Sequence, residues 1–281
     1  MTTIPKLPLG QGLEAAIDFL VEHFSFATKG FSVVMDGVLS VLERGLMALP
    51  PLVLIAIFTA LAFWLTRKSR GVTLFTFLGL GLIWNLGLWS ATVSTIALVL
   101  IATLTAILIG VPLGILAAMY RPVNRVVMPV LDVMQTMPAF VYLIPAIPFF
   151  GLGKVAAIFS TVVFAMPPAI RLTCLGIRQV PRELVECAEA FGSNRWQRLM
   201  KLELPLATPT IMAGVNQTVM LALSMVVIAA MIGAKGLGGE VWKAIQRLQM
   251  GAGFEAGVGI VIVAIILDRV LQKVGARTQK S

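Results

Sequence analysis

The chain alternates between long apolar runs and short polar segments, a pattern typical of a helical membrane protein. A run of about 20 apolar residues crosses the hydrocarbon core of a bilayer as an α-helix. The pattern predicts seven such helices, at residues 49–66, 72–89, 92–119, 126–150, 154–173, 208–233 and 256–271. An odd number of crossings places the two termini on opposite sides of the membrane. The sequence therefore predicts an all-α, polytopic helical bundle.

The segment before the first predicted span is more polar than the runs that follow it. Apolar side chains recur there at helical spacing, at Phe31, Val34, Val38, Val41 and Leu42. Polar side chains lie between them, at Ser32, Asp36, Ser40 and Glu43. We expect residues 1–48 to form an extracytoplasmic segment with an amphipathic helix at the membrane surface. Residues 49–90 would then form two accessory membrane helices.

Two spans carry residues that suggest how they pack. Residues 126–150 are interrupted by Pro129, Pro138, Pro145 and Pro148, and proline disrupts a straight helix. Irregular backbone at membrane depth is accepted where it is buried in protein or lines a watery cavity. We therefore expect this span to be broken and to form part of a translocation path. In the span before it, Gly110 and Gly114 have the spacing that lets two helices pack closely.

The longest polar segment between two spans is residues 181–205, and it predicts two short helices. Pro181 suits the first turn of a helix. Gly192 can adopt the left-handed conformation that ends it. Ser193 or Asn194 can cap a second helix. We therefore expect a bent pair of helices outside the membrane.

Each of the two predicted helices has an apolar side. In the first helix that side consists of Leu184, Ala188 and Phe191. In the second it consists of Trp196, Leu199 and Met200, with Arg195, Arg198 and Lys201 largely opposite. Pro205 is expected to help end the second helix before the next span. A pair of this kind could also lie flat on the bilayer or on its own bundle, and the pattern alone does not decide between these arrangements.

Composition and charge support a membrane protein with a defined orientation. With 58% hydrophobic and 12% charged residues and a mean hydropathy of +0.95, the chain has too little charge to cover a soluble surface. The net charge of +9 follows from topology, because 15 of the 22 basic residues fall on the side that carries residues 67–70. That side is therefore cytoplasmic, and nucleic acid is not needed to explain the charge. Cys174 and Cys187 both fall on this reducing side, which argues against a disulfide.

Within residues 181–205 the chain resembles the cytoplasmic coupling loop of importer permeases driven by ATP-binding-cassette (ABC) subunits. That loop has the pattern E-A-A-x3-G-x9-I-x-L-P. The positions that correspond to it are Glu186, Cys187, Ala188, Gly192, Leu202, Leu204 and Pro205. Cys187 replaces the middle alanine and Leu202 replaces the isoleucine, and both keep the small or aliphatic character.

Four further segments look like parts of the permeases of glycine betaine and proline betaine uptake systems, including choline-type relatives. They are QTMPAFVYLIPA from Gln135, FAMPPAIRLT from Phe164, TIMAGVNQT from Thr210 and LALSMVVIA from Leu221. The resemblance implies a type I ABC importer transmembrane core at residues 91–271, followed by a basic cytoplasmic tail at 272–281. It also implies a bacterial inner-membrane location and small quaternary ammonium substrates.

The same resemblance implies a set of partners: a second permease copy, two cytoplasmic ATPase subunits and an extracytoplasmic substrate-binding protein. The chain itself lacks the phosphate-binding pattern G-x4-G-K-[ST], because GLGK at 151–154 has Pro148 at the first glycine position and Val155 after the lysine. ATP and Mg²⁺ would therefore bind the ATPase subunits. We expect a non-catalytic subunit without a cofactor, in which Glu186 pairs with a cation of the ATPase. A single histidine leaves no basis for a histidine metal cluster.

Six residues are candidates for the translocation path, namely Asp132, Gln135, Phe140, Tyr142, Asn216 and Gln217. A quaternary ammonium group has no N–H donor, so aromatic faces and carboxylates recognise it. Phe140 and Tyr142 could supply such faces, or they could pack against neighbouring helices or lipid.

The polar candidates have two interpretations each. Asp132 lies in an apolar run and could serve the path, but it is near the cytoplasmic end of its span and could pair with Arg125 or Arg171. Asn216 and Gln217 lie deeper in their span, where they could join helices or line the path.

Two other classes of membrane protein fit the sequence less well. An ion-coupled secondary transporter or channel, acting without an ATPase, is expected to show paired buried charges or matching broken spans in two halves. An intramembrane enzyme needs paired ligands, paired aspartates or a serine with a base. The sequence shows none of these patterns, so the ATP-driven importer subunit is the preferred prediction.

Overall fold

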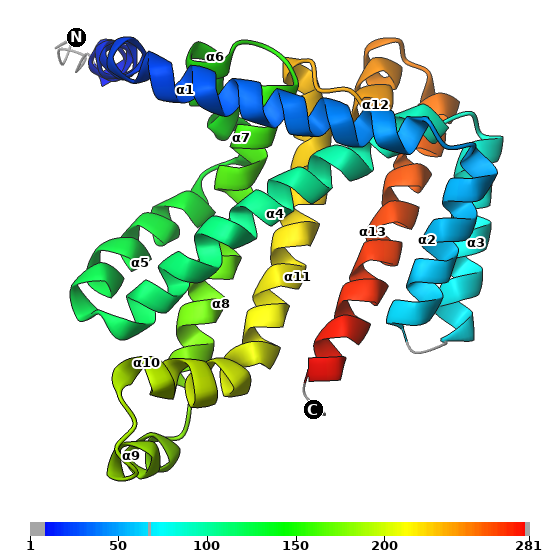
Figure 1. Ribbon diagram of the computed structural model, residues 1–281. Coiled ribbons are helices and arrows are strands. Elements are labelled where there is room, and N and C mark those ends of the chain that lie inside the picture. The colour runs from blue at the N-terminus through cyan, green and yellow to red at the C-terminus, as the bar shows by residue number, and fades with distance from the viewer. Residues whose placement is uncertain (1–8, 67–68, 279–281) are drawn as a thin grey trace, which may run out of the picture.

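A computed structural model of the protein describes residues 9–66 and 69–278, which are mostly helical and contain no β-strand. Along the chain the helices are α1 (Leu9–Met47), α2 (Pro51–Leu65), α3 (Arg70–Asn85), α4 (Trp89–Met119), α5 (Arg121–Thr136), α6 (Leu143–Phe150), α7 (Lys154–Ala165), α8 (Pro167–Arg178), α9 (Arg182–Ala190), α10 (Arg195–Arg198), α11 (Leu204–Ala229), α12 (Leu237–Gln246) and α13 (Met250–Thr278). The long helices run between an outer end with α1, α6 and α12 and an inner end with α9 and α10 (Figure 1).

The predicted spans correspond to helices of unequal length. Four stretches are long and apolar enough to cross a membrane: Trp89–Met119, Lys154–Arg178, Arg195–Ile232 and Met250–Lys273. The hairpin of α2 and α3 is shorter, with 15 and 16 residues. The connection between them includes residues 67 and 68, which lie outside the described residues.

The span predicted at residues 126–150 begins earlier and is bent. Its two parts, Arg121–Thr136 and Ala139–Phe150, meet at an angle of 115°. Met137 lies at the break with extended backbone angles, because the ring of Pro138 disfavours a helical conformation in the residue before it. The predicted interruption of this span is therefore confirmed.

The centre of the bundle is formed by α4, the continuous pair α7–α8 and α11. A β-carbon placed on Gly114 would lie 2.6 Å from the carbonyl oxygen of Ile170 and 2.7 Å from Cβ of Thr173. One on Gly110 would lie 3.0 Å from Cβ of Ala169. The close packing predicted for these glycines is confirmed, because only glycine lets α4 approach α8 this closely.

Helix α1 lies across the outer ends of the other helices (Figure 1). Nζ of Lys154 on α7 forms an ion pair with Oε2 of Glu43 on α1 at 2.5 Å. The ring of Phe31 contacts those of Phe150 and Phe159, with centroids 5.4 Å and 6.3 Å away. These contacts fix α1 to α6 and α7.

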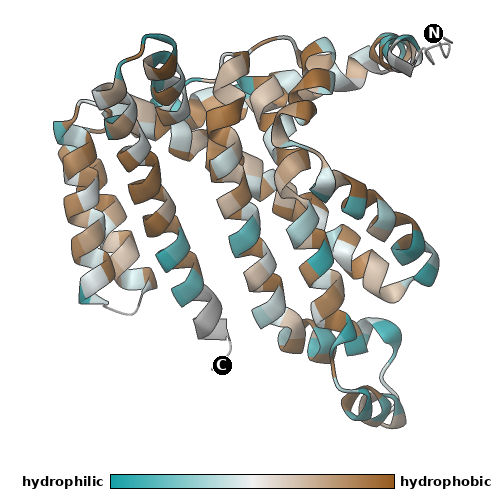
Figure 2. Ribbon diagram, turned by 180° about the vertical axis from the view of Figure 1, so that it is seen from behind, coloured by the Kyte–Doolittle hydropathy of each residue, from teal (hydrophilic) through white to brown (hydrophobic). Residues whose placement is uncertain are grey.

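The predicted apolar face of α1 is only partly used for packing. Phe31 and Leu42 are half-buried, but Val34, Val38 and Val41 are exposed. A helix that crosses a bundle contacts it only where it passes over another helix. The parts of its apolar face between these crossing points therefore stay exposed. Figure 2 shows apolar residues along the bundle and polar residues concentrated around α9 and α10.

Two predicted boundaries at the C-terminal side are wrong by several residues. The polar residues in the loop at 234–254 predict an outer helix at 240–249. This helix is α12, and it starts three residues earlier, after Gly236. The last helix was expected to end at residue 271, but α13 continues to Thr278. Most of the predicted basic tail is therefore helical, and residues 279–281 lie outside the described residues.

Candidate functional site

The inner end of the molecule carries the polar segment that the sequence singled out. Its first helix, α9, follows Pro181 and stops at a left-handed Gly192 with φ of 78°. The N–H of Ser193 donates to the carbonyl of Ala188 at 3.0 Å, and that of Gly192 donates to the carbonyl of Glu189 at 2.9 Å. This pair of bonds is the Schellman arrangement that glycine favours at helix ends. The predicted role of Gly192 is confirmed.

The second helix, α10, is capped by Asn194, which was one of the two predicted caps. Its side-chain oxygen accepts a hydrogen bond from the N–H of Gln197 at 2.8 Å. The side chain of Gln197 accepts one from the N–H of Asn194 at 3.0 Å. This reciprocal capping box satisfies two N–H groups at the start of α10 and fixes its direction relative to α9.

Pro205 does not end the second helix, so this prediction is wrong. Helical structure continues from Arg195 to Ile232 through a π-helical turn at Leu199–Glu203. In this turn the N–H of Leu204 donates to the carbonyl of Leu199, five residues back. Proline in an α-helix clashes with the carbonyl four residues before it. The wider π turn relieves this conflict, and α10 is therefore joined to α11 without a break.

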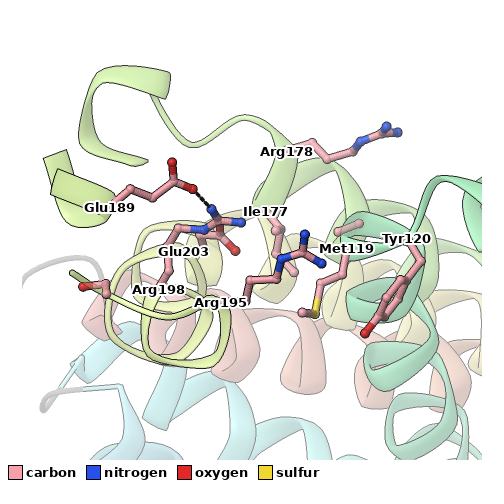
Figure 3. Close-up of a pocket in the computed structure, with 10 residues that line it drawn as sticks. Met119, Tyr120, Ile177, Arg178, Glu189, Arg195, Arg198 and Glu203 are labelled. Carbon is pink, nitrogen blue, oxygen red and sulfur yellow. Dashed lines mark hydrogen bonds and ion pairs between the residues drawn. The ribbon is translucent and has the colours of Figure 1, made fainter. Parts of the chain in front are cut away.

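Arg198 connects α9 to the start of α11. Its Nε donates to Oε1 of Glu203 at 2.8 Å, and its Nη1 donates to the carboxylate of Glu189 (Figure 3). The side chains of Arg198 and Glu203 are only 24% and 10% exposed. The sequence predicted Arg198 opposite the apolar side of this helix and did not reveal its two carboxylate partners. Spacing along one helix could not show that carboxylates before and after it would converge on its guanidinium.

The apolar residues of the segment divide into an anchor and an exposed surface. Leu199 is 1% exposed and packs with Ile177 of α8 and Ala207 of α11. Phe191 and Trp196 are 87% and 62% exposed. The prediction that Trp196, Leu199 and Met200 share a side holds as a pattern, but only Leu199 is buried. Exposed aromatic side chains on a firmly anchored element are typical of a surface that binds another protein.

The remaining motif residues lie on or beside this surface. Glu186 forms an exposed ion pair with Nε of Arg182, one turn earlier, at 2.9 Å. Cys187 is exposed, and Ala188 and Leu202 are half-buried. Leu204 packs against the cluster of Leu199. The motif thus combines backbone geometry, an anchor to the bundle and an exposed acidic face.

A cavity of about 380 Å³ separates this segment from the inner end of α4 and α8. Its lining residues are Ala118, Met119, Tyr120, Ile177, Arg178, Glu189, Ser193, Arg195, Arg198 and Glu203 (Figure 3). Arg178 donates to Oδ1 of Asn124 on α5 at 3.1 Å. The cavity has polar walls contributed by several helices.

The predicted path residues on the bent segment do not form one cluster. Asp132 forms an ion pair with Arg171 of α8, which confirms the predicted interfacial pairing and selects Arg171 over Arg125. Gln135 is exposed, and Phe140 is 58% exposed. These side chains are available for contact with a second subunit, lipid or solute.

Tyr142 is 6% exposed and serves packing in this structure. Its hydroxyl donates to the carbonyl of Met134, and its ring meets that of Phe164 edge-on at 5.6 Å. Ser160 of α7 donates to the carbonyl of Tyr142 at 3.2 Å. These contacts hold the break near Pro138 against α7.

Asn216 joins two membrane helices. Its Nδ2 donates to Oδ1 of Asp268 on α13 at 2.9 Å, and Gln217 is exposed. Asp268 was not among the residues predicted from the sequence. An acidic residue in an apolar run is a signal that could have identified it, but its partner is 52 positions away, beyond the reach of periodicity.

Comparison with known proteins assigns this arrangement to a family. Residues 110–280 match the family of the binding-protein-dependent transport system inner membrane component. The chain belongs to this family. It is therefore a multi-pass inner-membrane component of a transport system, and the family assignment supports the ABC importer over an ion-coupled secondary transporter.

Relatives match this family member along nearly its whole length. It is 50% identical over 274 residues to the glycine betaine transport system permease protein OpuAB of Bacillus subtilis, covering 98% of this chain and 96% of that protein. The glycine betaine/carnitine transport permease protein GbuB of Listeria monocytogenes is 49% identical, with 97% of each chain covered. The glycine betaine/proline betaine transport system permease protein ProW of Escherichia coli is 48% identical over 96% of this chain and 75% of its own length.

Solved structures agree on the fold of this family member. Two inward-facing crystal forms of the MetNI methionine ABC transporter match with TM-scores of 0.58 and 0.59. They are 22% and 24% identical and cover 66% and 69% of this chain, and 93% and 95% of their own. The predicted fold, that of a type I ABC importer transmembrane domain, is confirmed.

Proposed function

We propose that the chain is the membrane-spanning subunit of an ATP-driven importer for glycine betaine and related quaternary ammonium solutes. The substrate class is supported by relatives that are 48–50% identical and are named as glycine betaine transport permeases. The chain hydrolyses no ATP itself in this proposal. ATP and Mg²⁺ bind the ATPase subunits, and this chain needs no cofactor.

The observation that carries the proposal is the way α9 and α10 are attached. Their outer surface exposes Phe191 and Trp196, which can enter a groove on an ATPase subunit. Arg198 connects α9 to the start of α11. Leu199, directly after α10, packs against α8. A displacement of the docked surface is therefore passed to the central helices instead of being absorbed by a flexible loop.

The assembly in this proposal contains two copies of the chain and two ATPase subunits, with one ATPase subunit on each α9–α10 segment. A substrate-binding protein delivers the solute to the outer end. The exposed candidates Gln135, Phe140 and Gln217 are available to face the second copy and line a path between the copies, whereas Asp132, Tyr142 and Asn216 hold the helices around it.

Reconstitution into liposomes with the ATPase subunits and the binding protein tests this function, with uptake of radiolabelled glycine betaine as the readout. Uptake should require ATP inside the vesicles. Phe191→Asp should lower uptake more than tenfold, because loss of an interface anchor costs roughly 2 kcal/mol or more. Phe26→Asp is the matched control, since Phe26 is 91% exposed on α1 at the opposite end. Uptake driven by an ion gradient without ATP would contradict the proposal.

A further inference from the structure

A second pocket, of about 570 Å³, lies at the outer end, between the start of α4 and the start of α12. These two helix starts are at the opposite end of the bundle from α9 and α10 (Figure 1). The size of the pocket is within the range of sites that hold small molecules. No residue of the coupling segment, residues 181–205, lines it, so its chemistry requires a separate explanation.

Glycines bring the N-terminus of α12 against α4 and α11. A β-carbon on Gly236 would lie 2.5 Å from Oγ1 of Thr95, and one on Gly238 would lie 2.6 Å from the carbonyl oxygen of Val226. Gly236 also has a φ of 125°, which side chains rarely adopt. The N–H of Leu237 donates to Oγ1 of Thr95 at 2.8 Å. Thus the beginnings of two helices are held side by side at one pocket.

The pocket is rich in unused hydrogen-bond donors. Ser90 and Ala91 in the first turn of α4, and Gly239 in the first turn of α12, line it. N–H groups in a first turn have no acceptor within their own helix. The positive ends of the two helix dipoles add to their attraction for an anion.

Ser94 is the observation that points to a ligand. Ser94 lines the pocket and is only 7% exposed, and its hydroxyl makes no hydrogen bond to any residue that the structure describes. Neighbouring Thr92 and Thr95 each donate to a carbonyl four residues back, at 2.9 Å and 3.0 Å. The hydroxyl of Ser94 is not among the fully buried atoms that lack a partner, so it opens into the pocket and is available to a bound molecule.

Charged and aromatic side chains complete the pocket. Lys235 is exposed and makes no ion pair within residues 9–66 and 69–278. Glu240 also lines the pocket, but Lys243 pairs with it at 2.9 Å. The net charge of the side chains at the pocket is therefore positive. Trp242 contributes an aromatic ring to the lining, and such rings attract quaternary ammonium groups.

We infer that this pocket binds a small betaine, a zwitterion with a carboxylate and a quaternary ammonium group. The first-turn N–H groups, the hydroxyl of Ser94 and the ammonium of Lys235 receive the carboxylate, and Trp242 lies beside the ammonium end. The permease then holds the solute itself at its outer end, separately from the binding protein. The identity of the solute rests on the proposed function, whereas the preference for a carboxylate follows from the donors.

The test uses the full-length chain in lipid nanodiscs without partners and measures binding of glycine betaine by saturation-transfer NMR titration. Choline is the matched probe, because it keeps the trimethylammonium group and lacks the carboxylate. Glycine betaine should bind at least tenfold more tightly than choline, and Ser94→Ala and Lys235→Gln should each weaken its binding roughly tenfold, as loss of a charge-assisted hydrogen bond does. Ser32→Ala and Lys29→Gln on α1 are matched controls that should leave binding unchanged.

Equal binding of choline, equal losses in the control variants or no saturable binding of glycine betaine would overturn the inference. It would also be overturned if the pocket variants weakened capture of the ligand-free binding protein and left betaine binding intact, because the pocket would then dock a protein carboxylate. Uptake by the assembled transporter separates the two proposals. If the wild type binds glycine betaine as expected but shows no ATP-dependent uptake, the pocket assignment stands and the proposed function fails.

Discussion

Single residues determine whether α9 and α10 move together with α11, and Arg198 is the most important of them. It serves two carboxylates, those of Glu189 and Glu203, while Arg195 one turn earlier is exposed. Arg198→Met should destabilise the protein by roughly 3 kcal/mol, because Glu203 would be left nearly buried without a partner. The thermal midpoint in detergent and ATP-dependent uptake should both fall, whereas Arg195→Met should change neither. Equal effects of the two variants would show that the ion pairs do not hold the segment.

Gly192 has a conformational role that can be tested separately from contacts, since nothing lies within 4 Å of the position of its missing β-carbon. Gly192→Ala should cost roughly 1 kcal/mol because alanine is strained at a φ of 78°. Gly192→Asn should cost less, because asparagine adopts this conformation more readily. Thermal unfolding of the two variants gives the comparison. If alanine were as well tolerated as asparagine, strain would not be the reason for glycine at this position.

At the scale of elements, the contact between α4 and α8 depends on Gly114. A larger residue there would meet the backbone of Ile170 at 2.6 Å, so Gly114→Ala should destabilise the protein by roughly 2 kcal/mol through overpacking. Gly81→Ala on α3 is the control, because nothing lies within 4 Å of its β-carbon position. The measurement is the midpoint of thermal unfolding by size-exclusion chromatography. A fall of similar size in both variants would assign the loss to helix position and not to the α4–α8 contact.

The elements were predictable to different extents for physical reasons. Apolar runs and cap residues act locally, so the long helices, the break near Pro138 and the turn at Gly192 could be identified from the sequence. Contacts between distant residues could not, and this applies to Arg198 with Glu203 and to Asn216 with Asp268. The end predicted at Pro205 failed because the pattern does not reveal a π turn.

At the scale of the whole molecule, the two native cysteines test the orientation. Cys187 is exposed on α9, and Cys174 is buried in α8. A membrane-impermeant maleimide should label Cys187 only from the cytoplasmic side, in inverted vesicles and not in intact cells. Cys187→Ser should abolish this labelling, and addition of the ATPase subunit should slow it severalfold by covering α9. Labelling of Cys187 from outside would reverse the topology and remove the basis for an ATPase contact there.

The π turn at Leu199–Glu203 makes the direction of α9 depend on chain length as well as on residue type. Deleting one residue of this turn would restore the clash between Pro205 and the carbonyl four residues before it, and it would rotate everything before the turn by about 100° around the axis of α11. The exposed side chains of Phe191 and Trp196 would then point in a different direction relative to the bundle, although neither residue had changed. In this part of the chain a one-residue deletion should accordingly be more damaging than many substitutions. Natural relatives should vary there in sequence but keep the same number of residues.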